Sequence, residues 1–211
     1  MSDIAPRLGS DQLPAYTAFA YKMLDLRAAA KSVASMVRAL KCDPQLRADR
    51  FAARDELQHT YDRIAGALGM PALQVRLALR KRVHIGGQAV LRGNSATEIR
   101  IFPLWGVANK KRHKWQPAEI GLTSPVIACE ILLHEIAHAH QCFFDRIGDH
   151  EHSFVRSYIV IERVMFDFGF GPLLQQEYRL CGCPPQSFAA SLQGTPRQSK
   201  SLDFGYSTAG H

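Results

Sequence analysis

The chain lacks a hydrophobic run that approaches the about 20 residues needed to cross a bilayer, so we expect no membrane span. Its first residues, Met1 to Pro6, contain neither a positively charged segment nor a hydrophobic one, and we expect no secretory signal peptide. Cysteine is scarce as well. The five cysteines are odd in number and widely scattered, which argues against a disulfide framework and favours a cytoplasmic location.

Acidic residues are nearly absent between residues 76 and 114. That window contains ten Lys and Arg side chains and one acid, Glu98, so it carries a charge of +9. The whole chain carries +7, and the remaining residues therefore sum to −2. A basic region of this kind favours an anionic partner, nucleic acid first. Basic side chains on the solvated faces of strands would explain the same charge equally well.

The most concentrated charge in this window lies in a predicted polar loop over residues 106–123. Four cations stand beside Trp115 within five residues: Lys110, Lys111, Arg112 and Lys114. Such a group could bind phosphates while the indole stacks on a base, so these four side chains are candidate nucleic-acid contacts, and DNA is a candidate partner. The alternative is a solvated loop anchored by the tryptophan.

The first third of the chain shows helical periodicity. From Pro14, apolar side chains recur at alternating spacings of four and three residues, which predicts one helix that ends at 42–44: Phe19, Met23, Leu26, Ala30, Val33, Val37 and Leu40. A second helix is predicted from Pro44 to Leu68, where Gly69 ends it. Together they predict a helical hairpin that packs on itself or on the next layer, with a coiled-coil dimer as the alternative.

The period changes to two between residues 73 and 105. Ile99 and Ile101 alternate with polar neighbours, and Gly86-Gly87 reads as a turn. We therefore expect two or three short antiparallel strands that end at Pro103.

A third predicted helix contains the pattern H-E-x-x-H at His134, Glu135 and His138. Ser124 is a suitable N-cap and Pro125 a suitable first helical residue, and the sequence between them and the motif is apolar nearly all round. Histidines four residues apart share one face of a helix, so both can bind one metal ion, and Glu135 can reach a water there as general base. Burying these groups is costly unless something such as a metal satisfies them.

A catalytic zinc site commonly has three protein ligands and leaves a fourth position for water. His134 and His138 supply two, and the candidates for the third are His140, His150, His152 and Glu162. His140 follows His138 by two residues and so falls on another face of the helix. His150 comes after a loop, at the start of a further predicted helix, where the chain can return to the metal. The residues themselves leave His150, His152 and Glu162 open.

His150 is followed four residues later by Phe154, and this arrangement after H-E-x-x-H resembles the SprT-like group of zincin metallopeptidases. In that group the second element reads H-G-x-x-F, whereas Glu151 stands at the glycine position here. Gly171-Pro172 and Tyr178 are similar to a related group of small bacterial metallohydrolases. The resemblance covers about residues 97–180. It implies an α+β fold with a small antiparallel sheet and the motif helix, Zn²⁺ bound by His134, His138 and His150, and Glu135 as the base.

The resemblance also implies an activity, the hydrolysis of peptide bonds, and a position for the substrate. In zincins the peptide lies extended along an edge strand beside the motif helix, and residues 97–102 are the candidate strand. Some SprT-like proteins degrade proteins crosslinked to DNA, although their usual C-terminal zinc ribbon is absent here. The ImmA-like peptidases are a second related group, but they usually carry glycine at the position of Ala137.

The resulting hypothesis has three segments: an N-terminal helical extension over 1–70, a zincin-like core over 71–185 and a flexible tail over 186–211. The predicted function is a zinc-dependent metallopeptidase that acts on protein or peptide substrates, with DNA-associated proteins among the candidates. The alternative is a nucleic-acid or nucleoprotein-binding module whose zinc site is structural or latent.

Overall fold

A computed structural model describes residues 13–79, 82–83, 86–92, 95–106, 116–117, 120–144 and 152–167. The helices are α1 (Pro14–Ala29), α2 (Val33–Cys42), α3 (Pro44–Leu68), α4 (Pro125–Phe144) and α5 (His152–Asp167). The strands are β1 (Gln74–Leu77), β2 (Arg82–Val83), β3 (Gly87–Arg92), β4 (Ser95–Ile101), β5 (Leu104–Gly106) and β6 (Ile120–Leu122). The fold is therefore α+β, as predicted.

The single helix expected from Pro14 to residues 42–44 is in fact two helices. At Ala30 the backbone is extended, and Ser32 begins α2 with a capping box in which its hydroxyl accepts a hydrogen bond from the Ser35 N–H at 3.1 Å. The prediction of one helix was wrong because the apolar spacing continues across the break. A local side-chain cap outweighs the periodicity there.

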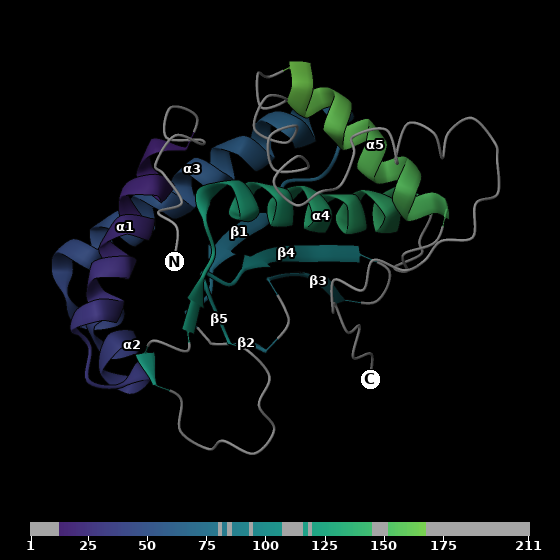
Figure 1. Cartoon of the computed structure of the whole chain (residues 1–211). Helices are drawn as coiled ribbons and strands as arrows, with labels where there is room; N and C mark the ends of the chain where they lie inside the picture. Colours follow the sequence, from purple (N-terminus) through teal and green to yellow (C-terminus); the bar gives the residue numbers. More distant parts are fainter. Residues whose placement is uncertain are drawn as a thin grey trace.

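Helix α3 has the predicted bounds. The Asp43 carboxylate accepts a hydrogen bond from the Leu46 N–H at 2.9 Å at its start, and Gly69 ends it in the left-handed conformation with φ 64°. Both α1 and α2 pack against α3 (Figure 1). The Glu56 carboxylate of α3 accepts hydrogen bonds from the N–H groups of Ala15 and Tyr16, at 3.2 and 2.8 Å, and so caps α1 from a distant part of the chain.

The N-terminal helices share their core with the rest of the described chain. One continuous cluster of buried apolar side chains includes residues of α1, α3, β1, β4, α4 and α5. In addition, the Tyr16 hydroxyl donates to the Thr123 carbonyl at 3.3 Å, and the Arg27 guanidinium donates to the Ile120 carbonyl at 3.0 Å. The predicted segment boundaries near residues 70 and 185 stay predictions.

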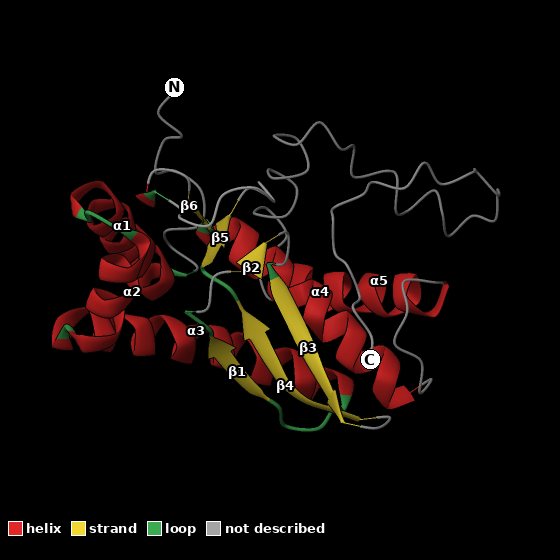
Figure 2. Ribbon diagram, turned by 90° about the horizontal axis from the view of Figure 1, so that it is seen from below, coloured by secondary structure: helices red, strands yellow, loops and turns green. Residues whose placement is uncertain are grey.

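The larger sheet has the strand order β1-β4-β3 (Figure 2). Strand β3 is antiparallel to β4, as expected, but β1 is parallel to β4, so the prediction of a purely antiparallel sheet was wrong. The predicted substrate strand over 97–102 falls largely on β4, which is paired on both sides. Among the described strands of this sheet, β3 is instead an edge strand that contacts α4, because β4, which follows it in the chain, lies between β3 and β1.

A second small sheet has the order β2-β5-β6. Strand β6 pairs antiparallel with β5, with Leu104 opposite Leu122. The sequence predicted a loop over 106–123 and missed this strand, because three residues are too few to show a period.

Helix α4 lies between the larger sheet and α5 (Figure 1). The Ser124 hydroxyl accepts a hydrogen bond from the Ile127 N–H at 3.3 Å and Pro125 is the first helical residue, so the predicted start is confirmed. Thirteen of the twenty residues of α4 are buried, which confirms a central helix covered on several sides. Ile99 and Ile101 of β4 belong to the same buried cluster.

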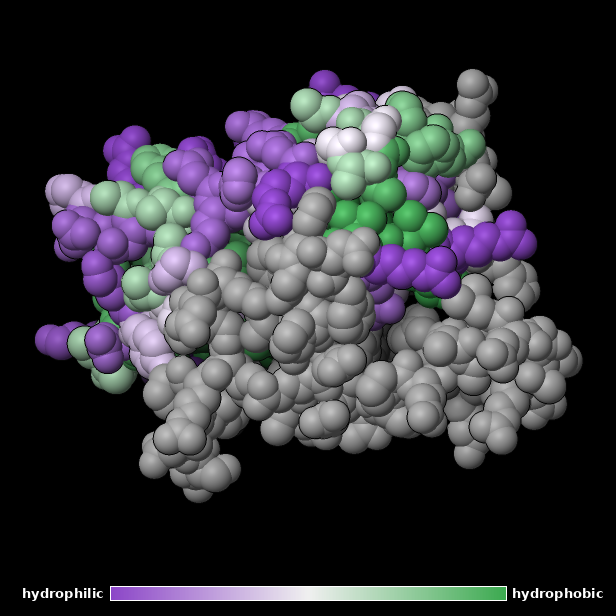
Figure 3. All heavy atoms as spheres, turned by 90° about the horizontal axis from the view of Figure 1, so that it is seen from above, coloured by the Kyte–Doolittle hydropathy of each residue, from purple (hydrophilic) through white to green (hydrophobic). Residues whose placement is uncertain are grey.

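Polar and hydrophobic surfaces are separated in the view from above. The left part of Figure 3, where α1 and α3 lie, is mostly hydrophilic, and hydrophobic atoms gather toward the side of α5. No helix within the described ranges is long and apolar enough to cross a membrane.

Candidate metal centre

The motif residues occupy one stretch of α4. The ring centroids of His134 and His138 are 4.9 Å apart, with an interplanar angle of 77°. Two imidazoles that bind one zinc ion at about 2.0–2.1 Å with a near-tetrahedral angle have ring centres about 5 Å apart, so this spacing fits a shared zinc ion. His138 is buried and His134 is partly exposed. The donor set therefore suits zinc as far as two ligands are concerned.

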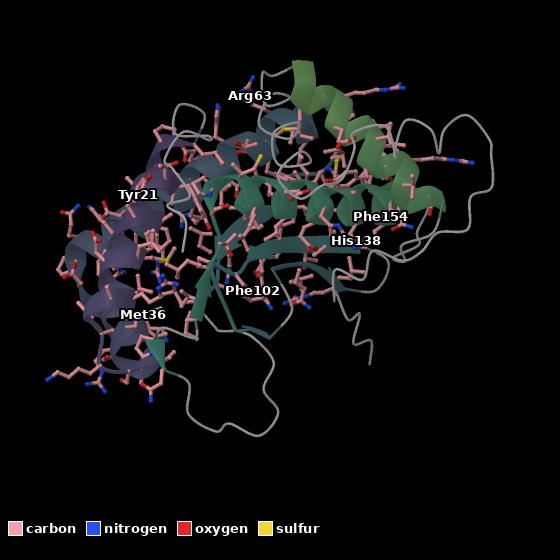
Figure 4. All side chains as sticks on the ribbon, in the orientation of Figure 1. Tyr21, Met36, Arg63, Phe102, His138 and Phe154 are labelled. Carbon is pink, nitrogen blue, oxygen red and sulfur yellow. The ribbon has the colours of Figure 1, made fainter. Side chains whose placement is uncertain are left out.

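Phe154 of α5 covers both imidazoles. Its ring centroid lies 4.9 Å from that of His134 and 4.5 Å from that of His138, and Figure 4 shows His138 and Phe154 at the same end of the α4–α5 pair. Tyr158, one turn further along α5, has its ring centroid 6.5 Å from that of His134. The first turns of α5 thus form an aromatic wall beside the two histidines.

Glu135 turns towards strand β3. Its Oε2 accepts a hydrogen bond from the Ala89 backbone N–H at 2.5 Å, and only 4% of the residue is exposed. Burial raises the pKa of Glu135 to about 8, and the hydrogen bond from Ala89 opposes part of that rise. A carboxyl group with these surroundings has the character of a general base or acid near neutral pH.

The close contact between β3 and Glu135 depends on Gly87. A Cβ atom on Gly87 would lie 2.4 Å from Ile131 Cγ2 and 2.8 Å from both Cγ and Oε1 of Glu135. These distances are far below ordinary contact, so only glycine allows β3 to lie this close to α4.

The neighbouring polar residues of α4 have other contacts. Nδ1 of His140 lies 2.9 Å from the Ser157 hydroxyl, and its ring packs 4.5 Å from that of Phe144. Gln141 donates a hydrogen bond to the Ser153 hydroxyl at 2.6 Å. These bonds fasten α4 to α5 alongside the motif, and they agree with the prediction that His140 lies on a different face from His138.

Five predicted site residues lie outside the described part of the chain: His150, Lys110, Lys111, Arg112 and Lys114. Gly171-Pro172 and Tyr178, which belong to the family resemblance, lie outside it too. The side chain of His152 is likewise not described. Within the described residues no three His, Cys, Asp or Glu side chains come together as a metal-binding group. The third ligand and the basic loop therefore remain predictions.

The position of Phe154 bears on the choice of third ligand. Its contact with both imidazoles brings the first turn of α5, which begins at His152, to the face of α4 that carries the two histidines. Glu162 lies eight residues beyond Phe154, which is about 12 Å along a helix axis. The choice among His150, His152 and Glu162 as third ligand stays a prediction.

Two arginines in the described part of the basic window form ion pairs within the sheet. The guanidinium of Arg76 lies 3.1 Å from the Glu98 carboxylate, and Arg100 pairs with the same carboxylate. These two arginines thus have a carboxylate partner within the sheet, and the role of the basic window in binding nucleic acid stays a prediction.

The sequence interpretation missed Gly87 and the Ala89 N–H as parts of the site. It read Gly86-Gly87 as a turn, but Gly87 is the first residue of β3. The available signal was a glycine at the start of an alternating segment, which can also mark the close approach of another element.

Comparisons of the chain with models of protein families, with curated proteins and with solved structures give no match. The resemblance to the SprT-like group therefore rests on its motif residues alone.

Proposed function

We propose that this protein is a zinc-dependent metallopeptidase. The observation that carries the proposal is the set of groups on one stretch of α4: two imidazoles spaced for one zinc ion and, between them in sequence, a buried carboxyl group. An edge strand, β3, lies beside this carboxyl group.

His134 and His138 would supply two zinc ligands and His150 the third. A zinc ion held there would act as a Lewis acid on a peptide carbonyl and lower the pKa of a bound water. Glu135 takes a proton from the attacking water on its carboxylate and later delivers it to the nitrogen of the leaving amine. Phe154 packs on both imidazoles and excludes solvent from that side.

Metal analysis tests the site directly. The purified wild-type chain is expected to contain about one zinc ion, in line with a single three-ligand site. A double variant with His134→Ala and His138→Ala should lose it, whereas the matched variant His140→Ala should keep it, since His140 bonds to Ser157. Full zinc content in the double variant would place the metal elsewhere.

Glu135→Gln separates catalysis from metal binding. The amide cannot act as a base, so this variant should keep its zinc and lose peptide hydrolysis. Activity equal to that of the wild type would remove Glu135 from the mechanism.

We further propose DNA-associated proteins as a substrate class, supported by the charge of +9 between residues 76 and 114. Reversing the charges of Lys110, Lys111 and Arg112 should weaken DNA binding and reduce its salt dependence. Binding that is unaffected by these changes would exclude this loop as the contact. DNA binding by a zinc-loaded chain that hydrolyses no peptide would favour the alternative, a nucleoprotein-binding module.

A further inference from the structure

The backbone N–H and C=O groups of β3 face β4 at one residue and point away from the sheet at the next. The Gly86 carbonyl accepts a hydrogen bond from the Phe102 N–H at 2.8 Å, and Gln88 and Val90 then face β4 in the same phase, opposite Arg100 and Glu98. Ala89 has the opposite phase, so its N–H points out of the sheet edge, where an edge strand normally has no partner. In this protein that N–H donates to Glu135 at 2.5 Å.

Two features of β3 therefore act on one side chain. The Ala89 N–H holds Oε2 of Glu135, and the bare Cα of Gly87 leaves the space in which Cγ and Oε1 lie. Glutamate has three rotatable side-chain bonds, and a hydrogen bond within a close-fitting wall restricts them strongly. A carboxylate without these contacts would move among several rotamers.

We infer that Gly87 and Ala89 of β3 are positioning residues for Glu135: they fix its carboxyl group in the orientation from which it takes the proton. The inference deepens the metallopeptidase proposal and rests on it. It assigns a role in catalysis to the backbone of β3, through the N–H group of Ala89 and the absence of a side chain at Gly87. Holding a base in place before the reaction contributes to rate because no reorientation is then needed.

Hydrogen exchange of single amides tests the contact without any measurement of activity. In the wild type the Ala89 amide should be protected although it lies on an edge. Glu135→Ala should accelerate its exchange by about tenfold, since the hydrogen bond to the Glu135 carboxyl group is lost. Gln88 and Val90, which face β4, should keep their protection. Glu135→Gln should retain part of the protection at Ala89, because its amide oxygen still accepts.

Removal of the donor tests the consequence for catalysis. Ala89→Pro deletes the N–H and puts the ring Cδ in its place, on the side of Glu135 Oε2, so the hydrogen bond is lost and the carboxyl group has to move. We expect kcat to fall about 10- to 100-fold, with little change in KM and with the wild-type zinc content. Ala89→Gly keeps the N–H and removes only a methyl group, so it should restore most of the lost kcat.

The outcomes separate the two proposals. If the wild type binds no zinc and hydrolyses no peptide, the metallopeptidase proposal fails, while the exchange of the Ala89 amide still decides whether β3 holds Glu135. If zinc and activity are present, equal Ala89 exchange in the wild type and Glu135→Ala would overturn the positioning role alone. Equal kcat in a folded, zinc-loaded Ala89→Pro variant and in Ala89→Gly would overturn it too.

Discussion

Replacing Gly87 by alanine should destabilise the protein by an amount that follows from its surroundings. The added Cβ would lie 2.4 Å from Ile131 Cγ2, whereas carbon atoms in good contact are about 3.5–4.0 Å apart. Ile131 is buried on α4 and branched at Cβ, so it cannot swing aside as the end of a long side chain could. Either β3 or α4 has to shift.

Overpacking of this kind costs about 1–3 kcal/mol. A Gly→Ala change also restricts the unfolded chain, which stabilises by about 0.4–1 kcal/mol where the backbone suits alanine. Gly87 meets that condition, because its φ is not positive. The net loss is then about 1–2 kcal/mol, and for a chain of this length Tm should fall by about 2–8 °C.

Thermal unfolding followed by circular dichroism measures this loss, and two other glycines provide controls. Gly66 is an exposed residue in α3 with no atom within 4 Å of an added Cβ, so Gly66→Ala should raise the stability by about 0.5–1 kcal/mol. Gly69 has φ 64°, so Gly69→Ala should lower it by about 1 kcal/mol through backbone strain alone. A Tm for Gly87→Ala at or above that of the wild type would refute the close approach of β3 to α4.

Three further predictions concern single side chains. Phe154→Ala should lower zinc affinity about tenfold in a competition titration by loosening both imidazoles, whereas the exposed Phe144→Ala should leave it unchanged. Cys42 is exposed, whereas burial and the charge of the neighbouring Glu130 carboxylate raise the pKa of Cys129 to about 12. Mass spectrometry after alkylation should therefore find Cys42 modified first. Early modification of Cys129 would contradict its burial. Burial raises the pKa of Glu56 above its ordinary value, so the folded chain holds this proton more tightly and loses stability as the pH rises through the folded-state pKa. Chemical denaturation at several pH values should show that the free energy of unfolding of Glu56→Gln declines less with rising pH than that of the wild type. An unchanged dependence on pH would exclude Glu56 as its source.

The parts of the fold that depend on local chemistry were predictable from the sequence. Asp43 and Gly69 bound α3, and Ser124 begins α4, because each cap acts on backbone groups within a few residues. The spacing of His134 and His138 likewise follows from the geometry of a single helix. Such features need no knowledge of distant neighbours.

The features that sequence reasoning missed depend on partners elsewhere in the chain. The parallel alignment of β1 with β4 is decided by how the chain crosses the sheet, and two alternating segments look the same in either direction. Gly86-Gly87 looks like a turn in the sequence alone, because the close approach of Gly87 to Ile131 of α4 cannot be seen there. The break after Ala30 was hidden for a different reason: the apolar pattern runs on through it.

The hydrogen-bond partners of α1 are synthesised at different times, so its contacts form in a definite order during synthesis. Glu56 is only 40 residues from Tyr16, so α1 can meet α3 soon after α3 has formed. Thr123, which accepts from the Tyr16 hydroxyl, is made 107 residues after it. At a synthesis rate of about 5–20 residues per second, that interval lasts about 5–20 s. Throughout that interval, the side of α1 that later contacts β6 and α4 has neither of these partners to cover it.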